Sequence, residues 1–131
     1  LPVPGGSAVR SSDDPTGVYQ RSSTFPPCPA GAREIIRFDG IESYGELYVN
    51  GQFIGMTKGS RLSAEFDVTD ALVEGDNLFA VKVLQYSDGS YIEDQDMWWA
   101  SGIFAMCTLC SVPPRTWSTL GSARTARAIP L

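Results

Sequence analysis

One segment of this chain, residues 87–98, brings four carboxylates together without a basic residue and ends in bulky apolar side chains. Its acidic residues are Asp88, Glu93, Asp94 and Asp96. Carboxylate oxygens bind hard cations and accept hydrogen bonds from sugar hydroxyl groups. In an extended stretch the side chains of Asp94 and Asp96 point the same way and could share a cation. The same carboxylates could instead accept backbone amides or face water, and both interpretations stay open.

Aromatic residues at the end of this segment extend its chemistry. The rings of Tyr91, Trp98 and Trp99 could each stack against the apolar face of a sugar. Trp98 is expected mainly to pack the segment onto the fold. Trp99 is the better candidate for an exposed platform, or for a contact with a neighbouring domain.

Pairs of acids could in principle hydrolyse a glycoside, because that reaction needs two carboxyl groups facing each other across the sugar. Glu93 with Asp96, or Glu42 with Glu46, supply such pairs on paper, but a sequence with 15 acidic residues offers many by chance. We therefore assign no catalytic residue to this chain alone. Histidine is absent, which excludes Ser-His and Cys-His catalysis and His-ligated zinc within the chain.

The three cysteines favour free thiols over a redox or zinc site. Cys107-x-x-Cys110 lies in a β-prone run, whereas the redox motif opens a helix. A zinc site usually needs four ligands, and only Cys28 could add another sulfur. Buried or half-exposed thiols are typical of a reducing compartment, so we expect a cytoplasmic location.

Charge and hydropathy exclude two classes of partner. The net charge is −5, and Arg115, Arg124 and Arg127 contribute +3 in a tail without acids, so residues 1–114 carry −8. An acidic body without a basic patch argues against nucleic acid, whose phosphates it would repel. No apolar run approaches bilayer length, so no membrane span is expected. The chain starts without Met or a leader, and we expect it to be a piece of a longer protein.

Short β-prone runs separated by turns indicate an all-β fold. Asn50-Gly51 is the strongest hairpin signal, and residues 69–72 predict a brief helical turn. No segment has a sustained helical period, and strands at this spacing predict an antiparallel β-sandwich. We expect an extended lead-in over 1–12, one domain over 13–114 and a linker or poorly ordered tail over 115–131. The expected strands are 18–25, 34–38, 46–49, 52–56, 65–68, 78–84 and 103–109.

Several motifs, taken together and in order, resemble one known family. They are Asp14-Pro15-Thr16-Gly17-Val18-Tyr19, Arg37-Phe38-Asp39-Gly40-Ile41-Glu42-Ser43, Tyr48-Val49-Asn50-Gly51-Gln52, residues 58–69, residues 75–81, and residues 87–98 continued by Ser101-Gly102-Ile103-Phe104. Over residues 13–104 the sequence resembles the N-terminal jelly-roll domain of β-galactosidases in glycoside hydrolase family 2. The resemblance implies a galactose-binding-domain-like β-sandwich. It departs from the family at Trp99 and Ala105, where the family usually has arginine.

The resemblance also implies a function. The domain would be an accessory sugar-binding domain that lends the acidic loop to an active site on a separate TIM barrel of the same polypeptide, where the β-galactoside is hydrolysed. Asp96 would contact the galactosyl group and ligate a sodium ion, and the parent enzyme would be a homo-oligomer. Trp99, where the family usually has arginine, is expected to be a second sugar contact from its aromatic character alone. This chain alone would not be catalytic. A free-standing carbohydrate-binding module and a purely structural interface domain remain alternatives.

Overall fold

The computed structural model describes residues 13–26, 28, 30–91, 101–113 and 125–128. Nearly all regular structure in these ranges is β-strand. One 3-10 turn, η1 (Gly89–Tyr91), follows β7. The strands are β1 (Thr16–Phe25), β2 (Arg33–Phe38), β3 (Ile41–Glu42), β4 (Tyr44–Val49), β5 (Gln52–Thr57), β6 (Ala64–Asp67), β7 (Gly75–Leu84), β8 (Gly102–Ile103), β9 (Cys107–Val112) and β10 (Thr125–Ala128).

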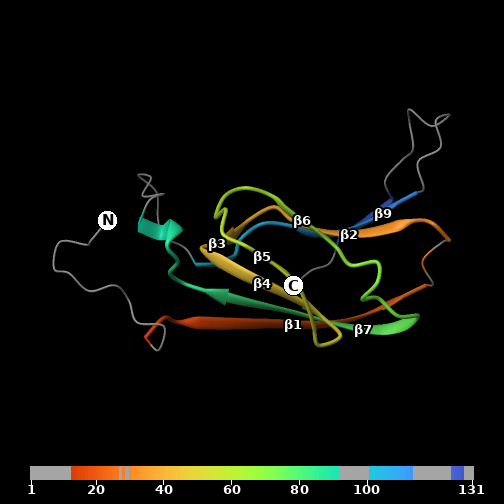
Figure 1. The fold of residues 1–131 in the computed structure, drawn as a ribbon, viewed down its shortest axis with the longest axis horizontal. Helices are drawn as coiled ribbons and strands as arrows, with labels where there is room; N and C mark the ends of the chain where they lie inside the picture. The colour runs from red at the N-terminus through yellow and green to blue at the C-terminus, as the bar shows by residue number, and fades with distance from the viewer. Residues whose placement is uncertain (1–12, 27, 29, 92–100, 114–124, 129–131) are drawn as a thin grey trace.

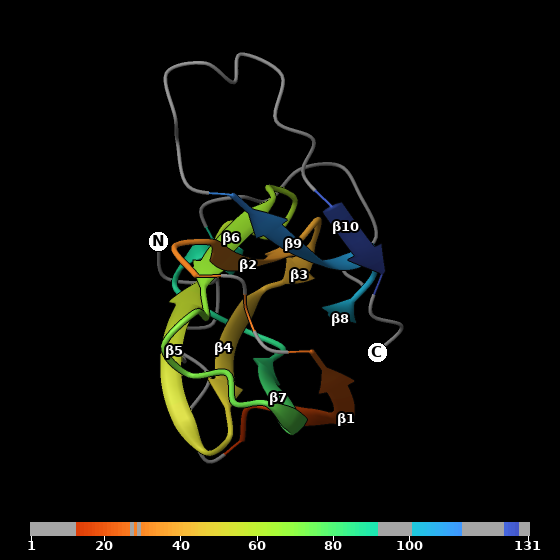
Figure 2. The same cartoon turned by 90° about the vertical axis from the view of Figure 1, so that its right-hand side faces the viewer.

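Two four-stranded antiparallel sheets face each other. The first sheet has the strand order β1-β7-β4-β5, and the second sheet has the order β10-β9-β2-β6. Figure 1 shows them as two layers, and Figure 2 shows the same layers after a quarter turn. β3 and β8 form a small two-stranded sheet at one end. The predicted jelly-roll β-sandwich is confirmed.

Alternating side chains of both sheets fill the core between them. Leu47 and Val49 of β4 are buried, as are Phe79 and Val81 of β7, because every second residue of a strand points the same way. The Phe25 ring meets the Phe79 ring edge-on, with 5.7 Å between the ring centroids. Further buried residues of this core are Ile36, Phe38, Ile41, Val68, Val83, Cys107 and Leu109.

Six of the expected strands are present, with ends shifted by a few residues. The expected strand over 103–109 is wrong, because the chain leaves the sheet after β8 and re-enters at β9. At the break, the Phe104 ring lies over Gly40, where a Cβ would approach it to 2.5 Å. The Asp39 amide donates to the Met106 carbonyl at 3.1 Å, which carries the chain into β9. β10, inside the segment expected to be a linker, was not predicted.

The hairpin and the helical turn predicted from the sequence are both present. Asn50 and Gly51 both have positive φ, 52° and 81°, as a tight hairpin between β4 and β5 requires. The Leu72 amide donates to the Val68 carbonyl at 3.1 Å, which closes one helical turn.

A buried asparagine fastens this region to the core. Asn77 is 1% exposed, and its Nδ2 donates to the carbonyls of Val73 and Gly75 at 2.7 and 3.0 Å. Its Oδ1 accepts from the Val73 amide and from Asn50 Nδ2, both at 2.8 Å. The side chain of Asn77 therefore uses its full hydrogen-bonding capacity inside the fold.

The paired cysteines of β9 point to different faces of their sheet. Cys107 belongs to the core together with Leu109, two residues on, so Cys110 projects from the opposite face. All three cysteines are free thiols. The described residues include no group of three His, Cys, Asp or Glu side chains that could hold a metal ion. They also include no helix of the length and apolarity needed to cross a bilayer.

Candidate functional site

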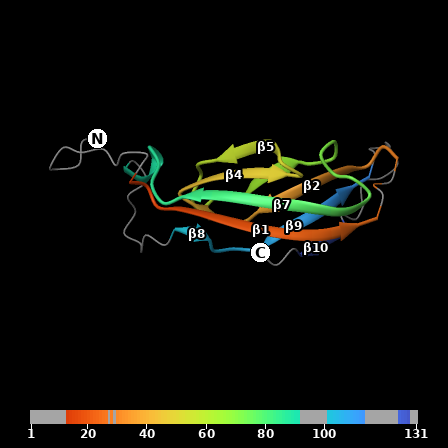
Figure 3. The ribbon, with the colours of Figure 1, turned by 90° about the horizontal axis from the view of Figure 1, so that it is seen from below.

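The acidic segment begins at one end of the sandwich, at η1, and the small sheet of β3 and β8 lies at the same end (left in Figures 1 and 3). Ser90 lies just before residues 92–100 and Ser101 lies just after them, and both line one small cavity. Asp96 and Trp99, the predicted substrate and metal contacts, lie outside the described residues. What the structure describes is therefore the base from which the segment leaves. The other residues lining the cavity are Glu42, Ser43, Ser60, Arg61 and Gln85.

The cavity itself is too small for a sugar. Its volume is about 20 Å³, whereas a water molecule needs roughly 10–15 Å³ and ligand pockets span roughly 300–1,000 Å³. Ser43 is buried beside it, and its Oγ has no hydrogen-bond partner within the part of the chain that the structure describes. One water molecule is the occupant that fits this volume and this hydroxyl group. The cavity thus belongs to the base of the segment and is not a sugar pocket.

Two ion pairs hold the base together. Arg61 Nη2 lies 3.4 Å from Glu42 Oε1, and both side chains are largely buried, at 26% and 14% exposed. Lys58 Nζ lies 3.0 Å from Asp88 Oδ2 at the surface. The hydrogen bond from Lys58 lowers the pKa of Asp88. Asp88, the one carboxylate of the acidic segment that the structure describes, is therefore committed to a lysine.

The start of the segment is held by the motif near the amino terminus. The Tyr86 amide donates to Asp14 Oδ1 and the Gln85 amide donates to the Pro15 carbonyl, both at 3.1 Å. The Ser87 amide donates to Ser90 Oγ at 3.0 Å, which shapes η1. Residues 14–15 and 85–86 are far apart in the sequence, and these hydrogen bonds join them directly before the acidic segment begins at residue 87.

An open groove lies next to the cavity and shares Gln85 and Ser101 with it. Its volume is about 210 Å³, below the usual range of ligand pockets. Tyr19, at 38% exposed, supplies its aromatic wall. A Cβ on Gly102, where φ is 124°, would lie 3.0 Å from the Tyr19 hydroxyl oxygen, so this close approach requires glycine. The remaining lining residues are Pro15, Thr16, Gly17 and Val83.

Of the paired acids considered for hydrolysis, Glu42 and Glu46 do not share a site, and Glu93 and Asp96 lie outside the described residues. Glu42 is bound to Arg61 at the cavity, whereas Glu46 lies on the outer face of the first sheet. The carboxylate of Glu46 accepts from the Tyr44 and Tyr48 hydroxyl groups at 2.9 and 2.8 Å. Burial alone would raise the pKa of Glu46, but the two tyrosines and Lys82 outweigh it and lower the pKa.

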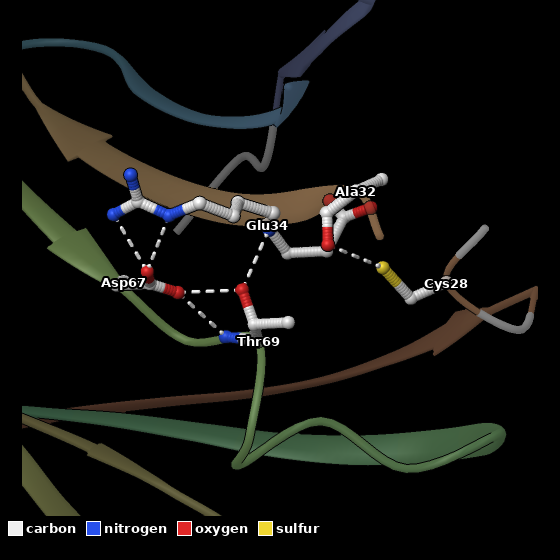
Figure 4. A network of polar contacts seen from close by, with 6 residues as sticks. Cys28, Ala32, Glu34, Asp67 and Thr69 are labelled. Atoms are coloured by element: carbon white, nitrogen blue, oxygen red, sulfur yellow. Dashed lines mark hydrogen bonds and ion pairs between the residues drawn. The ribbon is translucent and has the colours of Figure 1, made fainter. Parts of the chain in front are cut away.

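Arg61 and Glu65, four residues apart, have different partners, since Arg61 binds Glu42 and Glu65 lies 3.8 Å from Arg37. A further polar network surrounds Asp67, which follows Glu65 on β6. Its carboxylate accepts from the Arg33 side chain at 2.8 Å and from the amide of Thr69 at 3.1 Å (Figure 4). These contacts tie β6 to β2 away from the acidic segment and are structural.

Sequence reasoning missed the polar residues that build the base. Ser43 and Ser60 stand within recognised motifs and Gln85 in none, but none was singled out, because they meet only where β3, the 58–61 turn and the end of β7 converge. The Asp14-Pro15 motif was the available signal, since its order before the acidic segment matched the family. Its role in fixing the start of the acidic segment follows only from the hydrogen bonds that Asp14 and Pro15 accept from the amides of residues 86 and 85.

Comparison with known sequences gives one consistent family. The family described as "Glycosyl hydrolases family 2, sugar binding domain" matches residues 1–113. A β-galactosidase of Alteromonas mediterranea is 43% identical over 112 residues, covering 86% of this chain and 11% of that enzyme. One of Vibrio vulnificus is 49% identical over 102 residues, covering 78% and 10%. One of Kluyveromyces lactis is 44% identical over 115 residues, covering 87% and 11%. The chain spans about a tenth of the length of these relatives.

Solved structures share the fold. A Bacteroides uniformis β-glucuronidase superposes with a TM-score of 0.67 at 27% identity, covering 75% of this chain and 12% of that one. A β-glucuronidase of an uncultured Clostridium superposes with a TM-score of 0.64 at 29% identity, covering 73% and 19%. In each case the match falls on a small part of a much longer protein.

Proposed function

The chain belongs to the sugar-binding domain family of the family 2 glycosyl hydrolases, and we propose that it serves as the accessory domain of a β-galactosidase. In this proposal the sandwich is a stiff support that presents the acidic segment at the edge of an active site. The active site lies on a separate TIM barrel of the same polypeptide, which carries out the hydrolysis. The observation that carries the proposal is the 43–49% identity to β-galactosidases over most of the chain.

The geometry of the base supports a presenting role. Ser90 and Ser101, which flank residues 92–100, line the same cavity, so the chain on either side of this span is anchored at one place. That place is braced by Asp14 on one side and by the buried pair of Glu42 and Arg61 on the other. A segment on such a support can hold a carboxylate in a defined position, which binding and catalysis both require.

We assign the sugar contact to Asp96, whose carboxylate would accept hydrogen bonds from hydroxyl groups of the galactosyl unit. Trp99 would stack beside it. Asp96 would also ligate a sodium ion, for which carboxylate oxygen is a suitable donor. When bound, the ion would fix the hydroxyl groups that coordinate it. The full set of ion ligands requires the other domains, so this chain alone should bind sodium only weakly.

The test uses the parent enzyme that contains this chain. Asp96→Asn should lower kcat/KM for a β-galactoside by about 100-fold, as expected for losing a charged hydrogen bond of about 2–3 kcal/mol in the transition state. The activity of this variant should also be the same in sodium buffer as in choline buffer, whereas the wild-type activity should differ between the two. Asp88→Asn is the matched control, because Asp88 belongs to the same acidic segment but is bound to Lys58. It should retain activity within about twofold.

An Asp96→Asn enzyme that keeps wild-type kcat/KM and its sodium response would refute this assignment. Titration of the isolated chain with galactose and lactose, followed by NMR, separates the dependent domain from a free-standing module. The proposal expects no shifts at low millimolar sugar. Shifts at Tyr19 and Gln85, which line the open groove, would favour the module, since the groove is the largest opening described beside the segment.

A further inference from the structure

The outer faces of the two sheets have opposite character. The outer face of the second sheet is covered by ion pairs, with Arg33 bound to Asp67 and Arg37 bound to Asp39 and Glu65. This is the usual solvated face of an antiparallel sheet. The outer face of the first sheet, which Figure 3 shows from below, carries large exposed apolar side chains among polar residues, most of which lie on β1. Its exposed side chains include Val18 at 61%, Phe53 at 52%, Met56 at 50% and Leu78 at 43%.

The strand register arranges this apolar face in rows that run across the sheet. In the central row, Val18 of β1 pairs with Lys82 of β7, Lys82 with Glu46 of β4, and Glu46 with Met56 of β5. The row therefore places two opposite charges in the middle and one apolar side chain at each end. Lys82 Nζ and Glu46 Oε2 are 3.5 Å apart.

The neighbouring rows have apolar or aromatic residues on β7 and β4, whereas β1 contributes the polar residues Thr16 and Gln20. On one side, Leu84 lies beside Tyr44. On the other side, Ala80 lies beside Tyr48, and Phe53 packs edge-on against Tyr48 with 5.5 Å between the ring centroids. The tyrosine, phenylalanine and methionine side chains around the charged pair are of the types enriched in interface cores.

The pattern is self-complementary under a twofold axis that runs along the strands between β4 and β7. Such an axis stacks β7 of one copy on β4 of the other, and β1 on β5, while each row meets its own counterpart. Lys82 then faces Glu46 of a second copy, and Val18 faces Met56. Sheets packed face to face are rotated by about 30°. The central charges lie next to the axis, where this rotation displaces them least.

We propose that the outer face of the first sheet is an interface for a second copy of this chain. Strands of ten, ten, six and six residues cover roughly 500 Å² of face, at about 3.3 Å per residue and about 4.8 Å between strands. A stable dimer buries about 800 Å² per partner. The isolated chain should therefore form a weak dimer with a dissociation constant in the micromolar range. This inference is independent of the function proposed for Asp96.

Charge reversal tests the pairing directly. Sedimentation equilibrium should find wild-type chain monomeric at about 1 μM and largely dimeric at about 200 μM. Glu46→Lys alone and Lys82→Glu alone each bring like charges together across the axis and should weaken the dimer at least tenfold. An equimolar mixture of the two variants should dimerise again, because every charge then faces its opposite. This rescue is specific to the proposed axis.

Two further variants guard against a folding artefact, since Glu46 also accepts from two tyrosines. Val18→Lys and Met56→Lys change exposed side chains only and should also leave a folded monomer, checked by circular dichroism. Glu65→Lys, on the outer face of the second sheet, is the matched control and should dimerise like wild type. A wild-type chain that stays monomeric at about 200 μM overturns the proposal. So does a mixture of charge variants that fails to associate.

Discussion

Replacing Asn77 by alanine should destabilise the isolated chain by about 3–5 kcal/mol. The change removes four side-chain hydrogen bonds of 2.7–3.0 Å from a residue that is 1% exposed. Each bond contributes about 1 kcal/mol, and each buried group left without a partner costs about 1–3 kcal/mol. The Val73 amide and carbonyl, the Gly75 carbonyl and Asn50 Nδ2 would lose this partner together. Water entering the space left by the side chain offsets part of the loss, which keeps the total near the low end of the sum.

The measurement is urea unfolding followed by tryptophan fluorescence, with thermal unfolding as a second probe. At this chain length the expected loss corresponds to a Tm lower by about 10–20 °C. Asp76→Ala is the matched control, since Asp76 is the exposed neighbour of Asn77 and bonds only to Thr24 among the contacts described for it. It should cost under about 0.5 kcal/mol. A loss below about 1 kcal/mol for Asn77→Ala would show that this network does not fasten the hairpin to the core.

Two other expectations follow from the titratable groups. The Thr69 hydroxyl and amide and the Arg33 guanidinium hold the pKa of Asp67 below its ordinary value of 3.8, so this stabilisation is present above pH 3.8 and is lost as the pH falls through the lower folded value. Asp67→Asn should thus lower the free energy of unfolding by about 0.5–1 kcal/mol at pH 7, and the difference from wild type should shrink below about pH 4 in urea titrations. Burial raises the pKa of Cys107 to about 12, so a thiol reagent at pH 8 should modify the exposed Cys28 quickly and Cys107 only after denaturation, and fast labelling of Cys107 in the native chain would contradict its burial.

Local sequence signals predicted the strands whose own residues show a turn motif or an alternation of apolar side chains. Asn50-Gly51 has the positive φ values that its residue types allow, so the hairpin was readable from two residues. β7 was readable because Phe79, Val81 and Val83 alternate with residues of the other face. Nothing local marked β10, whose four residues are defined as a strand by pairing with β9. The break between β8 and β9 was hidden for the same reason, since it depends on Phe104 meeting Gly40 from another part of the chain.

In the candidate site, too, local patterns could be predicted from the sequence, whereas contacts between distant parts of the chain could not. The acidic segment and its aromatic end could be recognised from residue types at short spacing, and the assignment of Asp96 and Trp99 stays a prediction. The base could not be recognised, because Glu42, Ser60 and Gln85 are brought together by three separate turns of the sandwich. Spacing along the chain also gives no sign of the ion pair of Arg61, whose partner Glu42 is 19 residues away. Contacts across the fold determine electrostatics that sequence spacing does not encode.

The nearness of Ser90 and Ser101 sets the tolerance of this domain to change. Because Ser90 and Ser101, on either side of the nine-residue span 92–100, line one cavity, we expect a longer span to add only loop-closure entropy, about 0.6 kcal/mol for each doubling. Insertions and exchanges between these serines should leave the sandwich intact while altering what reaches a neighbouring pocket. We therefore expect the sequence of this short span to vary among related proteins without any change in the fold of the sandwich.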